Sequence, residues 1–277
     1  MTGSIYPIPR EAEMSNPDFV VTTVTPKQAE QYINGSNGTR NRPVKQSVCA
    51  RYARDMRAKR WALNGEPLII GKSGRVIDGR HRLNACVNAG VPFPTVIVTN
   101  VDDDAFDTID GGIARSAGDV LGFLDIADPQ MVAAVARYVW RHNQGNAIGT
   151  GGVSPSIREV EETIYAHPEI LNSVVVGRRV GRIIPRGLAG YLHWLFSGID
   201  STLADTFMDA LATGEYLSAD EPLHKLRERL ILDRAGKTRL VRREMAALVI
   251  KAWNLVRTRR KVKTLKWSNR EEFPVAL

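Results

Sequence analysis

Short apolar runs alternate with amphipathic segments over the first 115 or so residues, which predicts strands interleaved with helices. β-branched and aromatic residues dominate residues 19–24, and turn-forming residues bound three further apolar runs, at 67–70, 75–77 and 95–98. Thr25-Pro26 is a helix start, with threonine as the N-cap and proline in the first turn. This start and the periodicity predict helices over 26–34, 44–58 and 81–89, and a short helix opening at Asp102. The N-terminal part is therefore expected to be α+β.

After Ser116 the strand signals stop, and apolar residues recur three and four positions apart. Asp128-Pro129 starts one such helix, Ser156-Ile-Arg-Glu159 is a capping box at the start of the next, and Gly214 closes a later one. Further helices are expected from His167-Pro168 and from Pro185, around 203–211 and 223–231, and over 238–256. We therefore predict an arm at 1–18, an α+β domain at 19–120 and an all-α domain with a basic C-terminus at 121–277.

The composition indicates a globular protein. Of the 277 residues, 43% are hydrophobic and 25% are charged, which is enough apolar material for a core. No apolar run approaches the roughly 18–20 residues that a membrane span needs, so we expect no membrane partner. The N-terminus lacks a basic, apolar leader, and two cysteines make neither a disulfide framework nor a cysteine-rich zinc site. A cytoplasmic location is the expectation.

Positive charge is concentrated in two segments. The chain carries a formal charge of +8, yet residues 237–270 hold 12 Lys/Arg against one acid, Glu244, a net of +11. Residues 38–60 hold eight Lys/Arg against Asp55, a net of +7. Clustered cations indicate a polyanionic partner, most often nucleic acid, although a solvated surface is the alternative. The candidate DNA-binding residues are Arg257, Arg259, Arg260, Lys261, Lys263 and Lys266.

Two tryptophans, Trp253 and Trp267, bracket the most basic run. Aromatic rings among cations stack on bases in proteins that bind single strands. The alternative is that Trp253 belongs to the core of its helix.

The segment Asp78-Gly79-Arg80-His81-Arg82 joins a strand to a helix. Glycine permits a tight turn there, and the free backbone N–H groups of a helix start favour an anion. Together with three cationic or ionisable side chains they predict a phosphate pocket, in which Arg82 clamps oxygens and His81 donates or carries a proton. The alternative is a surface helix whose cations point into water.

Three carboxylates are candidates for holding a metal or acting as a base: Asp78, Glu66 and Asp110. Each has a structural alternative, since Asp78 can cap the following helix, Glu66 can be an exposed strand entry and Asp110 can serve a turn. The run at 102–104 could hold Mg²⁺, or could stabilise a helix start through the dipole. No spacing typical of a zinc site or a P-loop is present.

The Asp78-Gly-Arg-His-Arg-Leu83 motif after an apolar strand resembles the ParB/sulfiredoxin superfamily, in particular its D-G-Q-H-R-L branch common in phages and mobile elements. Asn64-Gly-Glu-Pro67 and Asp110-Gly-Gly-Ile-Ala-Arg115 also fit that branch, and the likeness covers about 19–120. The C-terminal half, through Ala252-Trp-Asn254 and Leu265-Lys-Trp267, resembles a helical domain that accompanies such modules. If the chain is phage-encoded, its location would be the cytoplasm of the bacterial host.

The resemblance implies a nucleotide site. In chromosome-partitioning ParB proteins the loop reads G-E-R-R-x-R-A and binds a triphosphate, usually CTP. This chain keeps Gly79 and Arg82 but has Arg80 where that family has the glutamate linked to hydrolysis. Sulfiredoxin chemistry is excluded, because Arg80 also takes the place of the nucleophilic cysteine. The implied phosphate-binding residues are Gly79, Arg80, His81, Arg82 and Arg115.

Three functions follow from these observations. The first is a nucleotide-regulated, ParB-like DNA-binding protein, with a homodimer as one way to transmit the switch. The second is an enzyme, a Mg²⁺-dependent nuclease or phosphotransferase in which Asp78, His81 and Arg82 do the chemistry. The third is an inert interaction protein, in which contacts within the chain occupy His81 and Arg82. Clustered carboxylates beside His81 would favour the enzyme.

Overall fold

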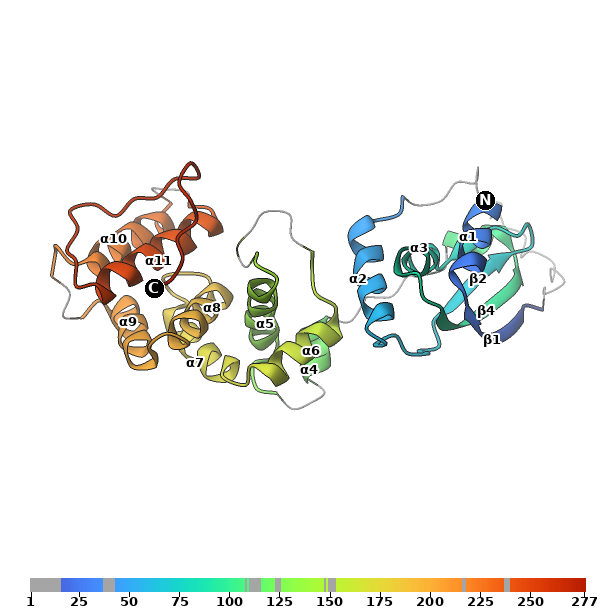
Figure 1. The fold of residues 1–277 in the computed structure, drawn as a ribbon, viewed down its shortest axis with the longest axis horizontal. Coiled ribbons are helices and arrows are strands. Elements are labelled where there is room, and N and C mark those ends of the chain that lie inside the picture. Colours follow the sequence, from blue (N-terminus) through green and yellow to red (C-terminus); the bar gives the residue numbers. More distant parts are fainter. Residues whose placement is uncertain are drawn as a thin grey trace, which may run out of the picture. The chain divides into compact units, whose positions relative to one another are not determined.

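The computed structural model describes residues 16–36, 43–107, 109, 116–122, 126–146, 148, 153–215, 218–236 and 240–277. The chain divides into two compact units, Met1–Ala114 and Arg115–Leu277, and each is described by itself (Figure 1). The expected order, a mixed unit with a small sheet followed by helices, is confirmed. The division lies a few residues before the expected boundary after residue 120. Most of the expected N-terminal arm lies outside the described residues.

The first unit is a four-stranded sheet with three helices. Its elements in chain order are β1 (Asp18–Val24), α1 (Pro26–Gly35), α2 (Gln46–Arg57), β2 (Pro67–Gly71), β3 (Val76–Asp78), α3 (Arg80–Ala89), β4 (Phe93–Val101) and a 3₁₀ turn (Asp103–Asp107). The strand order is β1-β4-β2-β3, with β2 parallel to β4 and the other pairs antiparallel. The expected helix start at Thr25 is confirmed, since its side chain and that of Gln28 form a capping box.

Helix α3 lies between α1 and α2 and packs on the sheet (Figure 1). Leu83 and Cys86 of α3 are fully buried with Leu68 of β2 and Phe93 of β4. Burial raises the pKa of the Cys86 thiol to about 11, so this cysteine is a small core residue rather than a reactive one. The core thus fixes the start of α3 against β2.

Strand β1 forms one edge of the sheet and is apolar on its surface. Phe19, Val20 and Val21 are 78%, 53% and 62% exposed. Only β4 pairs with β1, so the outer edge of β1 has backbone groups with no neighbouring strand in the described sheet.

The described part of the second unit contains helices and no strand. They are α4 (Ala117–Gly122), α5 (Pro129–Asn143), α6 (Ile157–Ala166), α7 (Ile170–Val180), α8 (Arg186–Ser197), α9 (Ser201–Thr213), α10 (Pro222–Arg234) and α11 (Arg242–Arg257). Trp253 of α11 is fully buried, and its ring stacks on Phe196 of α8 with centroids 4.3 Å apart. The expected start of α6 is confirmed, with Ser156 and Glu159 in a capping box.

Helix α4 was not expected from the apolar pattern. Ser116 and Asp119 cap it reciprocally, because Asp119 accepts from the Ser116 backbone N–H and Ser116 accepts from the Asp119 N–H. Ala117 and Leu121 are buried in the core of the helical unit. The residues just before position 120 therefore belong to the second unit.

The segment that follows α11, residues 258–277, is bound to the helical unit and is called the C-terminal strap. Leu265 and Trp267 are buried in the core. The Trp253 indole donates to the Leu277 carbonyl at 3.1 Å, and the Arg229 guanidinium donates to the Leu265 carbonyl at 3.2 Å. The cations of the strap therefore sit on an ordered backbone.

Among the described residues, no helix is long and apolar enough to cross a membrane.

Candidate functional site

The turn between β3 and α3 requires glycine at position 79. Gly79 has φ of 98°, in the left-handed region. A Cβ at this position would meet the Leu68 side chain of β2, so any other residue would both strain the backbone and displace the core. The first residues of α3 are in this way held close to β2.

Arg82 is buried by contacts within its own unit. Its guanidinium donates to the carbonyls of Glu66 and Pro67 at 2.7 and 2.8 Å, and to the Asp78 carboxylate at 2.7 Å. The residue is 9% exposed. These bonds join the start of β2, the end of β3 and the first turn of α3. A phosphate at this loop would have to compete with all three acceptors for the terminal guanidinium nitrogens.

His81 is also engaged. Its Nε2 accepts a hydrogen bond from the Lys45 backbone N–H at 3.1 Å, at the N-cap position of α2. An accepting Nε2 belongs to the neutral imidazole, with the proton on Nδ1. Burial lowers the pKa of His81, although the nearby Asp78 carboxylate opposes the shift. The imidazole thus holds the start of α2 in its neutral form.

The other predicted loop residues are placed as follows. Arg80 is half-buried, and its Nε has no hydrogen-bond partner among the described residues. Asp78 pairs with Arg82 and does not cap α3, which begins without a side-chain cap. Glu66 is exposed and contributes its carbonyl to Arg82. Asp110 and Arg115 lie outside the described residues.

No group of three histidine, cysteine, aspartate or glutamate side chains suited to a metal ion occurs in the part of the chain that the structure describes. The acidic run at 102–104 holds the turn between β2 and β3. The Asp103 carboxylate accepts from the Ser73 backbone N–H and hydroxyl at 3.1 and 2.7 Å, and Lys72 pairs with Asp102 at 2.5 Å. These contacts give two of the three acids a structural role.

The basic segment 38–60 uses part of its charge inside the first unit. Arg57 donates to the carbonyls of Asn88 and Ala89, at the C-terminus of α3 where the helix dipole favours a cation. Arg60 pairs with Asp55 at 3.0 Å. Residues 37–42 lie outside the described residues. The described cations of this segment therefore include members that stabilise the fold.

The cations at the end of α11 and in the strap are exposed and largely unpaired. Lys261 pairs with Asp220 at 2.5 Å. Within the described ranges no acid pairs with the other five predicted DNA-binding residues, Arg257, Arg259, Arg260, Lys263 and Lys266. Neither tryptophan beside this run is available to stack on bases, because Trp253 and Trp267 are both buried.

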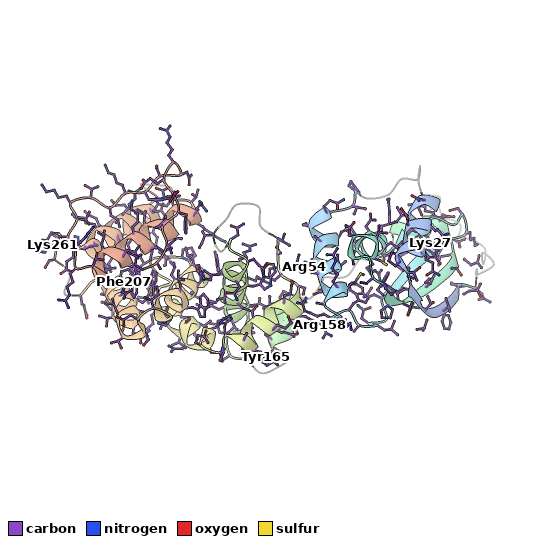
Figure 2. All side chains as sticks on the ribbon, in the orientation of Figure 1. Lys27, Arg54, Arg158, Tyr165, Phe207 and Lys261 are labelled. Atoms are coloured by element: carbon purple, nitrogen blue, oxygen red, sulfur yellow. The ribbon has the colours of Figure 1, made fainter. Side chains whose placement is uncertain are left out.

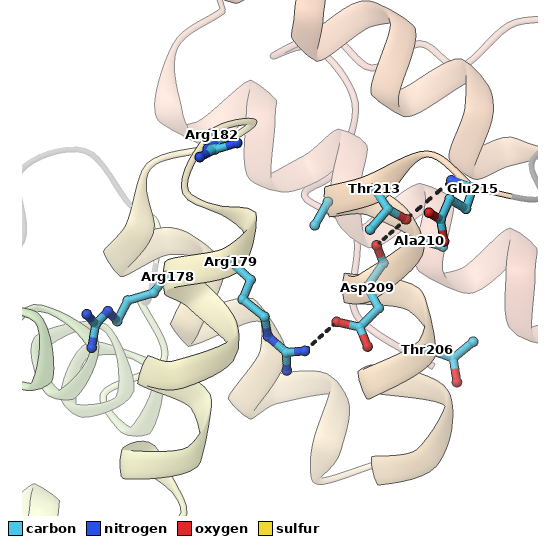
Figure 3. A pocket seen from close by; sticks show the side chains of 9 residues that line it. Arg178, Arg179, Arg182, Thr206, Asp209, Ala210, Thr213 and Glu215 are labelled. Carbon is cyan, nitrogen blue, oxygen red and sulfur yellow. Dashed lines mark hydrogen bonds and ion pairs between the residues drawn. The ribbon is translucent and has the colours of Figure 1, made fainter.

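A second arginine group lies in the helical unit, where α7 faces α9 (Figure 3). Arg178, Arg179 and Arg182 line one side of an open cleft of about 950 Å³, and Asp209 and Glu215 line the other. Arg179 pairs with Asp209 at 2.9 Å across the cleft. Its signal in the sequence is the composition of residues 178–186, which hold four arginines and no acid.

Histidines that are far apart in the sequence meet around Trp194 of α8. The rings of His142 and His167 each lie 5.3 Å from the Trp194 ring. His142 also bonds the Tyr191 hydroxyl at 3.0 Å, and burial lowers the pKa of His142. The sequence spacing of these histidines, which matches no metal motif, gave no sign of this proximity.

Ser173, His193 and Asp205 form a serine–histidine–carboxylate chain. His193 Nδ1 lies 2.9 Å from the Ser173 hydroxyl, and its Nε2 lies 3.0 Å from the Asp205 carboxylate. Nucleophilic catalysis needs a serine that substrate can reach, and Ser173 is 1% exposed. The chain of contacts thus ties α7, α8 and α9 together as a structural element.

Comparison with known proteins found no matching protein family, curated protein or solved structure.

Proposed function

We propose that this chain is a DNA-binding protein that holds the phosphate backbone on the exposed cations at the end of α11 and on the C-terminal strap. The observation that carries the proposal is the contrast between the two basic segments. In the first, Arg57 and Arg60 are used inside the fold, whereas Arg257, Arg259 and Arg260 have no acidic partner among the described residues. Exposed cations without an acidic partner are free to neutralise DNA phosphates and so release their counterions.

The proposal concerns the phosphate backbone rather than the base sequence. Phosphate contacts position a protein on DNA without reading sequence, and arginine and lysine supply most of them. Arg182, which follows α7, extends the cationic surface of the same unit, since it is exposed and lines the cleft of Figure 3. Arg178 and Arg179 of α7 are instead paired with Asp128 and Asp209.

The ParB-like part of the proposal rests on the motif at Asp78–Leu83. In this proposal the Gly79–Arg82 turn stabilises the first unit. His81 is bonded to the Lys45 backbone N–H, and Arg82 is bonded to the Glu66 carbonyl and to the Asp78 carboxylate. These contacts match the interaction-protein alternative at this loop. The enzyme alternative called for carboxylates gathered beside His81, and among the described residues the Asp78 carboxylate pairs with Arg82 instead.

The DNA-binding proposal is tested by charge neutralisation. The triple variant Arg257→Gln, Arg259→Gln, Arg260→Gln is compared with the control Lys27→Gln, Arg137→Gln, Arg158→Gln, which removes the same charge from other exposed positions. Figure 2 labels Arg158 of α6, which lies apart from Lys261 of the strap within the helical unit. We expect the first variant to weaken binding to a labelled duplex at least tenfold in fluorescence anisotropy. Equal affinity of the two variants would refute the assigned surface.

The nucleotide expectation is tested separately by calorimetric titration of CTP, ATP and GTP, with and without Mg²⁺. Arg80→Ala is the informative variant, because Arg80, unlike Arg82, makes no side-chain hydrogen bond to the fold among the described residues. If the wild type binds a triphosphate and Arg80→Ala does not, the result would support a phosphate site at this loop. If the folded protein binds no triphosphate, the Gly79–Arg82 turn has a structural role alone.

A further inference from the structure

An apolar pocket of about 330 Å³ opens in the helical unit where α9, the start of α10 and the end of α11 meet. Leu203 and Phe207 of α9, Leu223 of α10, and Leu255 and Val256 of α11 supply its apolar lining. Figure 2 labels Phe207 on α9 and Lys261 in the strap, and both border this pocket. A volume of this size is within the range of small-molecule sites.

Charged residues complete the lining of the pocket. Arg259 and Arg260 line the pocket and have no acidic partner among the described residues, whereas Lys261 is paired with Asp220. Glu221 lines it as well, at the N-cap position of α10. Helix α10 begins without a side-chain cap, so its first turn adds a partial positive charge at the same place.

The backbone places Arg259 at a strained position. Its φ of 52° is in the left-handed region, and it occupies the turn that closes α11, where glycine is the favoured residue. A side chain other than glycine is conformationally unfavourable at such a position. The fold therefore holds this cation at the pocket despite a conformational cost.

We propose that this pocket holds the base of an unpaired nucleotide in a single strand, with the neighbouring phosphates on Arg259 and Arg260. The inference rests on the proposed function and adds that the chain prefers single-stranded to double-stranded nucleic acid. The apolar lining fits the faces of a base, and the Glu221 carboxylate can accept a hydrogen bond from an exocyclic amino group. A base in a duplex cannot enter the pocket without leaving its stack.

The α7–α9 cleft is a weaker candidate for the same ligand. It is larger and more open, and Arg179 there is already paired with Asp209. It lacks the convergence of apolar side chains with unpaired cations that the α9–α11 pocket shows.

The test measures the affinity of the full chain for three labelled probes: a single strand, the same strand carrying abasic residues, and the corresponding duplex. Abasic residues keep the phosphates and remove the bases. A matched pair of variants accompanies the probes. Ala210→Leu fills the pocket, whereas Ala212→Leu makes the same change at a position that lines only the cleft.

We expect the abasic strand to bind about tenfold more weakly than the intact strand, and Ala210→Leu to lose about tenfold on the intact strand alone. Ala212→Leu is expected to match the wild type on every probe. If the abasic strand binds as tightly as the intact one, or if Ala210→Leu changes nothing, the pocket has no role and the backbone-binding proposal stands. If the folded protein binds no probe, both proposals fall.

Discussion

Arg82 shows that a residue can match a sequence motif and yet have its side chain engaged in hydrogen bonds within the fold. It occupies the position that the proposed ParB likeness would assign to a phosphate-binding arginine, and its terminal nitrogens donate to the Glu66 and Pro67 carbonyls and to the Asp78 carboxylate. Removing it would leave two half-buried carbonyls and a carboxylate without their donor. An unsatisfied buried acceptor costs about 1–3 kcal/mol, and a charged one costs more.

Arg82→Gln is therefore expected to lower the free energy of unfolding by about 3 kcal/mol, measured from the urea midpoint. Arg80→Gln is the control and should change the unfolding free energy by about 0.5 kcal/mol or less, because the Arg80 guanidinium makes no hydrogen bond to the part of the chain that the structure describes. An unchanged midpoint in Arg82→Gln would show that its contacts are incidental.

Three histidines, His193 buried and His81 and His142 half-buried, give the unfolding free energy a pH dependence. Burial lowers the pKa of His81, of His142 and of His193, the last despite the opposing Asp205 carboxylate. A lowered folded-state pKa means that the unfolded chain binds more protons, so stability is complete above the unfolded value near 6.5 and is lost as the pH falls below it. Each histidine contributes a slope of up to about 1.4 kcal/mol per pH unit in that window.

The urea midpoint should therefore stay constant between pH 8 and about pH 6.5, and should decrease as the pH is lowered from there to 5. His193→Asn should reduce the slope by up to one proton's worth, since His193 is buried at 1% exposure. A midpoint that stays constant over this range would contradict the lowered pKa values of these three histidines.

At the scale of elements, the two basic helices end in the same way. In α2 the Arg60 N–H donates to the Asp55 carbonyl at 2.8 Å, with Lys59 in the left-handed region. In α11 the Arg260 N–H donates to the Leu255 carbonyl at 2.9 Å, with Arg259 in that region. Both are Schellman closures in which a cation replaces the usual glycine.

Arg259→Gly should accordingly raise the free energy of unfolding by about 1 kcal/mol and at the same time weaken nucleic-acid binding. Lys59→Gly is the matched control, with a similar gain in stability and no loss of binding. Thermal unfolding and anisotropy on the same samples measure the two effects. Retention of full affinity by Arg259→Gly would remove Arg259 from the interface.

Strand β1 carries an expectation for self-association. The homodimer implied by the ParB likeness remains a proposal, and the exposed edge of β1 is the surface in the described sheet best suited to pair with a second copy. Val21→Lys should reduce concentration-dependent association in sedimentation velocity, because a charge on an edge strand opposes pairing. An unaltered distribution would place any dimer contact elsewhere.

Elements with strong local signals were predictable from sequence, and contacts between distant residues were not. The Thr25 N-cap before Pro26 and the capping box at Ser156 located the starts of α1 and α6, because those signals depend on residues no more than three apart. The short α4 has a similar signal at Ser116 but too few apolar residues to show a period. The partners of Arg82 and His81 depend on how β2 and α2 fold back on α3, which no local pattern encodes.

At the scale of the whole molecule, some cations of the basic C-terminal segment make contacts within the fold, whereas others are exposed. Of the +11 in residues 237–270, Lys251 and Lys261 are paired with acids, and Arg243 lies over the Phe273 ring at 4.6 Å. Truncation before the strap would be a poor test of binding, because it would also remove the buried Leu265 and Trp267. Substitution of surface cations keeps the core intact.

The salt dependence of binding is the expected signature at this scale. The slope of log affinity against log salt should fall by about 0.9 for each duplex phosphate that the protein no longer neutralises, so the Arg257, Arg259 and Arg260 triple variant should reduce the slope by roughly 2–3. Anisotropy titrations at several salt concentrations measure the slope. A parallel shift without a change of slope would indicate that these residues act through the fold rather than on phosphates.

Lys59 and Arg259, which have left-handed backbone conformations at the ends of α2 and α11, have a consequence for laboratory evolution. Because glycine relieves the backbone at both positions, selection of random variants for heat resistance alone should enrich glycine at Lys59 and at Arg259. Adding a selection for nucleic-acid retention should leave the enrichment at Lys59 and suppress it at Arg259. The mutational record at two geometrically equivalent positions would then report which one the ligand touches.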